Sequence, residues 1–306
     1  MNPENATPPS CATILLTYRR PQHTTQVLAA LRRDNVQNII FVSDAPAKTE
    51  HVGDVEATRA LFYTIDWTVP TKIFRDQNLG LAKSVIDSVN FAFETFDEVI
   101  VLEDDCVPAE RFFELAHLCL AKYRKNMEVF GFSGYAPVIP NTILQKIPYD
   151  VIFLPRISSW GWATWKDRWQ QRIPDLRTAI QECLDNKIPL GVGGEDLPTY
   201  ILGALQGTLH DTWTLPWALT LNRARAVFVF PAKPQIDNIG FDGTGVHCSS
   251  SQSTCISQKL SDQTLRIPDY QCIHPEIYRE FCRQLCPKVI VKEQWIQNLL
   301  NGISST

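Results

Sequence analysis

The chain has 306 residues, a formal net charge of -4 at pH 7 and no cluster of basic residues. This charge disfavours a nucleic-acid partner, because phosphate backbones are bound mainly through lysine and arginine. No apolar run approaches the roughly 20 residues that a transmembrane segment needs, and the N-terminal MNPENATPPS is too polar for a signal peptide, so we expect a cytoplasmic protein.

Apolar runs alternate with helical patterns in the first hundred residues. Runs at 12–16, in NIIFVSDAP and in TKIFRD are each followed by a polar loop and then by a segment of helical periodicity. This alternation predicts an α/β fold, in which a mainly parallel central sheet has helices on both faces. No GxGxxG follows the first run, which disfavours a dinucleotide site. The loop LLTYRRP instead suits a nucleotide or sugar phosphate that is held by side chains.

The next apolar run, in EVIVLEDD, ends in the consecutive carboxylates Glu103, Asp104 and Asp105. We expect a buried strand there, whose carboxyl end presents these acids where open α/β sheets bind ligands. Adjacent negative charges repel one another, and hard divalent cations prefer oxygen ligands, so the segment predicts a site for Mn²⁺ or Mg²⁺. The alternative is a helix N-terminus, because Asp105 and Pro108 could begin the helix AERFFELAHLCLAKY.

The segment SSWGWATWKDRW contains a cluster of four tryptophans. Trp162, Trp165 and Trp169 recur at helical spacing, which favours burial. Trp160 and Gly161 lie in a loop of small residues where a substrate could approach, and an indole ring can stack on the face of a sugar. We therefore expect these two residues to contact substrate.

The glycine-rich segment NIGFDGTGVHC is the last motif of the chain. Its glycines permit a loop to fold closely over a ligand, and the imidazole of His247 could complete the coordination of a carboxylate-bound metal. Asn238 and Asp242 are weaker candidates in the same loop.

The order of these motifs resembles the GT-A (nucleotide-diphospho-sugar transferase) fold of glycosyltransferases. VLEDD is similar to the EDD form of the family's DXD motif, as in bacterial glycosyltransferase family 2-like proteins and the N-acetylglucosaminyltransferase I group. The resemblance covers roughly 12–248, and its most specific segments are VLEDDCVPA, SSWGWATW and NIGFDGTGVHC. It implies a metal-dependent hexosyl- or N-acetylhexosaminyltransferase. Such an enzyme moves a sugar from a nucleotide-diphosphate donor to a hydroxyl of a glycan, lipid-linked or protein acceptor, with inversion of the anomeric configuration. The expected donor is a UDP-sugar.

The resemblance also implies roles for individual residues. Asp105 would ligate the metal directly, His247 would contact the metal or the pyrophosphate, and the segment of Trp160 and Gly161 would close over the donor sugar. The other donor-binding residues would line the nucleotide pocket (Thr17, Tyr18 and Arg20), contact the base (Asp44), lie near the ribose and pyrophosphate (Arg75, Asn78, Gly80 and Lys83) or complete the acidic motif (Glu103 and Asp104).

An inverting transferase needs a base that takes the proton of the acceptor hydroxyl. Asp211, in LHDTWTLPW, resembles the acid that supplies the base in the N-acetylglucosaminyltransferase I group, although that group has two adjacent acids there. Glu195 and Asp196, in GVGGEDLP, could instead act as the xED acid of other GT-A enzymes, or could cap the helix PTYILGALQG. We favour Asp211.

We expect a single catalytic domain at 11–248, with a nucleotide-binding half at 11–107 and an acceptor half at 108–248. A flexible N-terminus at 1–10 precedes it, and a mobile loop with a small helical extension follows at 249–306. The nine cysteines lack zinc-site spacing, so we expect most of them to be reduced and buried. The alternative function is a non-catalytic sugar- or nucleotide-binding protein on the same fold. A nucleotidyltransferase ranks below both, because LLTYRRP lacks the glycine-rich loop and lysine of that class.

Overall fold

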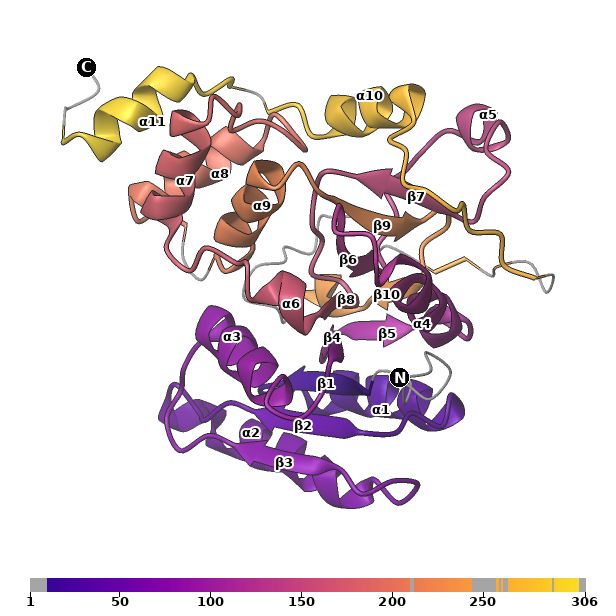
Figure 1. The fold of residues 1–306 in the computed structure, drawn as a ribbon. Helices are drawn as coiled ribbons and strands as arrows, with labels where there is room; N and C mark the ends of the chain where they lie inside the picture. The colour runs from indigo at the N-terminus through magenta and orange to yellow at the C-terminus, as the bar shows by residue number, and fades with distance from the viewer. Residues whose placement is uncertain are drawn as a thin grey trace, which may run out of the picture.

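A computed structural model describes residues 10–209, 212–243, 257–258, 260, 264–287 and 289–302. In this part of the chain an eight-stranded sheet runs through the molecule in the order β3-β2-β1-β4-β8-β6-β9-β7, with a short ribbon of β10 and β5 beside it (Figure 1). The strands are β1 (Cys11–Thr17), β2 (Ile39–Ser43), β3 (Thr71–Phe74), β4 (Glu98–Glu103), β5 (Cys106–Pro108), β6 (Val129–Ser133), β7 (Val151–Leu154), β8 (Trp162–Trp165), β9 (Val227–Pro231) and β10 (Ile236–Asn238).

The predicted α/β fold is confirmed. β1 pairs in parallel with β2 and β4, and β2 pairs in parallel with β3, so the first four strands of the sheet share one direction. The second half mixes directions, because β8 runs antiparallel to β4 and β6, and β7 runs antiparallel to β9. The sheet is continuous across the boundary predicted between the two halves of the chain.

Helices cover both faces of the sheet, as expected. Side chains that alternate along a strand enter opposite cores: Leu15 of β1 belongs to the core that includes residues of α1 and α4, whereas Ile14 belongs to the core that includes residues of α3 and of α7 to α9. The principal helices are α1 (Pro21–Arg33), α2 (Val52–Ala60), α3 (Leu81–Ala92), α4 (Phe112–Tyr123), α5 (Asn141–Leu144), α6 (Lys166–Trp169), α7 (Leu176–Asp185), α8 (Leu197–Leu205), α9 (Thr214–Arg223), α10 (Pro275–Gln284) and α11 (Glu293–Leu300). Among the described helices, none is long and apolar enough to span a membrane.

The helical interpretation of the tryptophan cluster is wrong for two of its members. Trp162 and Trp165 lie in strand β8, and Trp169 ends the short helix α6. A spacing of three places two residues on one face of a helix but on opposite faces of a strand, and these two indoles do enter opposite cores. The prediction that all three are buried is confirmed.

The acidic motif is the end of a strand, and the helix alternative for it is wrong. β4 extends through Glu103, β5 follows at once, and α4 begins only at Phe112. The cysteine prediction holds in part, since Cys119 and Cys183 are free and buried, whereas Cys272 and Cys286 are free and exposed.

Candidate active site

An arginine from the first loop bridges the two aspartates of the acidic motif. Arg20 follows β1, and Asp104 and Asp105 follow β4; because these strands are parallel neighbours, their carboxyl ends meet at one edge of the sheet. Nη2 of Arg20 donates to Oδ1 of Asp104 and, at 2.9 Å, to Oδ2 of Asp105. Both aspartates are buried, so the ion pairs are largely shielded from solvent.

One cation does not neutralise this group of acids. Burial raises the pKa of Glu103 to about 8, and repulsion from Asp105 and Asp104 acts in the same direction. Burial also raises the pKa of Asp104 to about 6, against the attraction of Arg20. For Arg20, burial lowers the pKa, but the attraction of the two aspartates outweighs it, so the pKa is raised overall. The motif therefore favours additional positive charge.

The side chains around the acidic motif include donors for an anion and some of the ligands that a hard cation needs. Nη1 of Arg20 and Nε of Arg75 are buried and have no hydrogen-bond partner among the described residues, as donors that await an anionic ligand would be. The carboxylate oxygens of Asp104 and Asp105 are hard donors, which suits Mg²⁺ or Mn²⁺. The described residues hold no group of three His, Cys, Asp or Glu side chains that could bind a metal, and His247 lies outside them.

Tyr18 connects the acidic motif to the loop after β2. Its backbone N–H donates to Oδ2 of Asp104 at 3.3 Å, and its hydroxyl accepts from the N–H of Ala47 at 2.9 Å. The same hydroxyl lies 2.7 Å from Nδ1 of His51. No sequence pattern predicts His51, because a single imidazole in a short 3-10 turn belongs to no repeat or motif.

Asp44 holds the loop that precedes α3. Its carboxylate accepts from the N–H groups of Ala45 (2.9 Å), Leu79 (2.9 Å) and Gly80 (3.0 Å). Asn78 donates from Nδ2 to the carbonyl of Ala45 at 2.7 Å. Both carboxylate oxygens of Asp44 thus accept from backbone amides, and these hydrogen bonds fix the start of α3. The predicted contact of Asp44 with the nucleotide base stays a prediction.

The other predicted donor residues differ in how close they lie to this network. The hydroxyl of Thr17 is buried and donates to the carbonyl of Val42 at 2.8 Å. Arg75 forms an ion pair with Asp87 at 3.2 Å, and Lys83 is exposed on the first turn of α3. Thr17 therefore fixes the end of β1 against β2, whereas the side chain of Lys83 lies at the surface.

Gly240 allows the segment NIGFDGTGVHC to approach the acidic motif closely. β10 pairs with β5 directly after the acidic motif, and the N–H of Ile239 donates to the carbonyl of Asp105 at 2.9 Å. A Cβ on Gly240 would lie 2.2 Å from Oδ2 of Asp105, so only glycine permits this approach. Nε2 of His23 lies 3.1 Å from a carboxylate oxygen of Asp242 and 3.2 Å from the carbonyl of Ile239, which ties the loop to α1.

Trp160 belongs to a half-buried aromatic cluster beside this loop. Its ring centroid lies 5.2 Å from that of Tyr135 and 5.7 Å from that of Phe241, both edge to face. Because Phe241 follows Gly240, the cluster lies next to the acids. No sequence pattern predicts Tyr135 or Phe241 as site residues. The only signal for Phe241 was its place inside NIGFDGTGVHC.

The two acids of GGEDLP have different surroundings from the EDD motif. Asp196 accepts from Nη1 and Nη2 of Arg156, each at 2.9 Å, in a mostly buried ion pair. Glu195 is exposed, with Sγ of Cys286 3.6 Å from Oε2. Asp211, the favoured base, lies outside the described residues.

Two solved structures resemble parts of this fold. One is the mannosyltransferase PcManGT from Pyrobaculum calidifontis in complex with GDP-Man and Mn²⁺, at 16% identity and a TM-score of 0.39, over 64% of this chain. The other is residues 1–349 of TarS from S. aureus, at 10% identity and a TM-score of 0.38, over 72% of this chain. The matched parts span 52% and 60% of those two chains, respectively. No protein-family model matches this sequence, and no curated protein matches it.

Proposed function

We propose that the chain is a GT-A glycosyltransferase that uses a nucleotide-diphosphate sugar. The observation that carries the proposal is Arg20, which bridges Asp104 and Asp105 while its Nη1 is buried without a partner among the described residues. A guanidinium with a spare N–H beside a group of acids can bind a phosphate oxygen next to a carboxylate-bound cation.

The donor nucleotide would occupy the carboxyl ends of β1, β2 and β4. Arg20 and Arg75 would each contribute a buried N–H that has no partner among the described residues to the diphosphate. Gly80 immediately precedes α3, and the positive end of a helix dipole favours phosphate. Tyr18 and Asp44 hold the loops that would surround the nucleoside.

Asp105 and Asp104, with His247, would hold Mn²⁺ or Mg²⁺. When bound, the cation would neutralise charge that develops on the leaving diphosphate. This role fits the raised pKa values of Glu103 and Asp104, which burial causes first and repulsion between neighbouring acids increases.

The aromatic cluster of Tyr135, Trp160 and Phe241 would close over the donor sugar. Aromatic faces pack against the C–H faces of sugars, and Trp160 lies beside the loop that contacts Asp105. Asp211 would take the proton of the attacking hydroxyl, so that transfer inverts the anomeric configuration.

One observation favours the alternative of a binding protein without turnover. Arg20 already bonds both aspartates, and such a pair needs no metal to persist. Nucleotide binding without transfer would identify this alternative.

A donor screen tests the proposal directly. The purified chain is incubated with Mn²⁺ and a panel of UDP- and GDP-sugars, and release of nucleoside diphosphate is measured. We expect release from one donor, and Arg20→Lys should lower it by about tenfold or more, because lysine lacks the bidentate fork. The control is Arg32→Lys, whose side chain is exposed and pairs with Asp66. If at least one donor binds but none is cleaved, the chain is a binding protein; if none binds, the proposal fails.

A further inference from the structure

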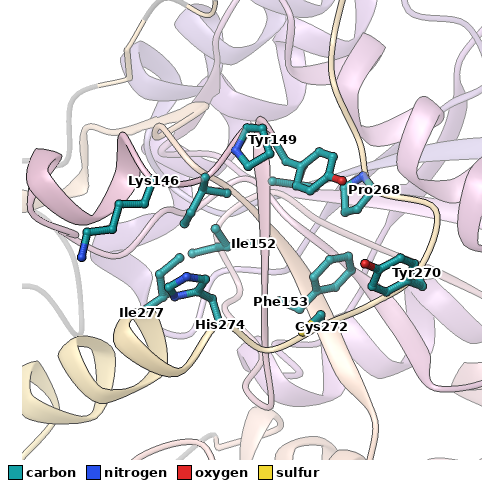
Figure 2. Close-up of a pocket in the computed structure, with 12 residues that line it drawn as sticks. Lys146, Tyr149, Ile152, Phe153, Pro268, Tyr270, Cys272, His274 and Ile277 are labelled. Atoms are coloured by element: carbon teal, nitrogen blue, oxygen red, sulfur yellow. The ribbon is translucent and has the colours of Figure 1, made fainter.

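A cavity of about 200 Å³ lies at the far edge of the sheet, outside the site described above. Figure 2 shows its lining, which comes from the segment before β7, from β7 itself, from 268–274 and from the first turns of α10. β7 is four strands away from β4 in the sheet, which is roughly 19 Å at the usual spacing of about 4.8 Å. The cavity is therefore separate from the acidic motif.

Buried apolar side chains form the floor of the cavity, and exposed tyrosines form its rim. Ile152, Phe153 and Ile277 are at most 4% exposed, whereas Tyr149 is 38% and Tyr270 is 68% exposed. A rim of this kind offers aromatic faces that end in hydroxyl groups, which suits a ligand that is partly apolar and partly hydroxylated.

Two polar residues, His274 and Lys146, belong to the lining of the same cavity. Nδ1 of His274 is buried and has no hydrogen-bond partner among the described residues, although the ring lines the cavity (Figure 2). His274 is the N-cap residue of α10, but its side chain makes no capping bond there. Lys146, also in the lining, pairs with Glu276 at 2.7 Å. A buried nitrogen without a partner is uncommon in folded proteins, and a ligand hydroxyl would satisfy it.

We propose that this cavity is a second carbohydrate-binding site, which takes a single pyranose ring. Pockets for drug-sized ligands measure roughly 300 to 1,000 Å³, so the smaller volume here limits the occupant to one small ring. A pyranose has C–H faces for the tyrosines and Phe153 and hydroxyls for Nδ1 of His274 and the phenol groups. A hydrocarbon chain would leave Nδ1 of His274 unpaired, which disfavours a lipid. The site goes beyond the proposed transfer reaction, and sugar binding there requires no turnover.

Saturation-transfer NMR on the full chain, without nucleotide or metal, tests this site. The probes are methyl α-mannopyranoside, methyl β-glucopyranoside, methyl β-galactopyranoside and methyl N-acetyl-β-glucosaminide, with octanol as the hydrocarbon probe. We expect at least one pyranoside to bind. Tyr270→Ala and His274→Phe should each weaken its affinity about three- to tenfold, because one removes a rim ring and the other keeps the ring but removes Nδ1. Tyr63→Ala, which removes a tyrosine of similar exposure far from the cavity, should have no effect.

Two further measurements separate this site from the proposed active site and from misfolding. Trp160→Ala should leave pyranoside binding unchanged. In the wild type, bound sugar should slow alkylation of Cys272, which lines the cavity, but not of Cys286, which is exposed elsewhere. The proposal is overturned if no pyranoside binds, if binding is lost in Trp160→Ala but retained in Tyr270→Ala and His274→Phe, or if octanol alone protects Cys272.

Discussion

Asp196 is one of the candidate bases, and at the scale of single residues its hydrogen bonds bear on that role. Both oxygens of Asp196 accept from Arg156. These two charge-assisted hydrogen bonds occupy both oxygens, so an acceptor hydroxyl would have to displace Arg156 to reach either of them. Its contacts indicate a role in fixing the loop of GGEDLP against the segment that contains Arg156.

We expect Asp211→Asn to lower transfer on the order of 100-fold or more, because asparagine keeps the size of the side chain but cannot take a proton. Donor affinity should stay near that of the wild type, so the loss appears in kcat. Single-turnover transfer and calorimetric titration of the donor measure the two quantities.

The matched comparison is Asp196→Asn, which should lower the free energy of unfolding by about 1 to 3 kcal/mol, since it removes a charged partner of Arg156. Its remaining folded protein should still transfer sugar. Full folding of Asp196→Asn with abolished transfer, beside an active Asp211→Asn, would move the base to GGEDLP. Glu195→Gln completes the series.

At the scale of elements, a glycine sets the distance between β6 and its neighbours. A Cβ on Gly131 would lie 2.3 Å from the carbonyl oxygen of Ala163 in β8 and 2.7 Å from the ring of Phe228 in β9. We expect Gly131→Ala to destabilise the protein by roughly 1 to 3 kcal/mol, as overpacking of a core does. Gly53→Ala is the control: it lies in α2 with nothing within 4 Å of the added methyl, and should stabilise by about 0.5 to 1 kcal/mol. Urea denaturation measures the free energy of unfolding of both variants. Equal changes in Gly131→Ala and Gly53→Ala would contradict the close packing around Gly131.

The first residue of β4 should make stability depend on pH. Glu98 is 4% exposed and lies opposite Trp165 of β8. Burial raises its pKa to about 7 from an ordinary value of 4.5, while Trp165 and Arg124 oppose the shift. Between these two values the folded state binds more protons than the unfolded state. This contribution to stability is therefore fully present below pH 4.5 and is lost as the pH rises through about 7.

We expect the free energy of unfolding to fall between about pH 5 and pH 8, and Glu98→Gln to reduce this fall, because glutamine stays neutral. Urea denaturation at a series of pH values measures the slope for each protein. The control is Glu94→Gln, because Glu94 is exposed and lies four residues before Glu98. It should keep the pH dependence of the wild type. If Glu98→Gln also keeps it, other groups cause the pH dependence.

For the molecule as a whole, the sequence predicts the first half of the fold better than the second. β1, β2 and β4 are apolar runs buried on both faces and separated by helical segments, so both periodicity and order reveal them. β7, β8 and β10 have only three or four residues each, and β8 pairs with a strand more than sixty positions earlier. Short segments carry too little periodicity to separate strand from helix, which is why the spacing of the tryptophans wrongly predicts a helix at Trp162.

The candidate site, like the fold, can be predicted from the sequence only in part. Glu103, Asp104 and Asp105 are adjacent in sequence, so their repulsion could be recognised without coordinates. Arg20 joins them through the pairing of β1 with β4, and Phe241 reaches Trp160 through the pairing of β10 with β5. The sequence does not contain those distances, because each depends on a fold that brings together positions far apart in the chain.

Binding of nucleoside diphosphate should stabilise the entire fold, because it links the loops after β1, β2 and β4. A ligand at about 100 times its Kd adds roughly 2.7 kcal/mol to the free energy of unfolding. For a chain of this length we expect UDP or GDP with Mn²⁺ to raise Tm by about 4 °C or more. EDTA should abolish the rise, and so should Asp105→Ala, since Asp105 is the proposed metal ligand. Asp76→Ala, which removes an exposed acid from the loop before α3, should keep the rise. Differential scanning calorimetry measures each shift against the same variant without ligand. A rise that survives both EDTA and Asp105→Ala would show that Arg20 and its neighbours bind the diphosphate without a metal, and the transferase would then belong to a metal-independent class.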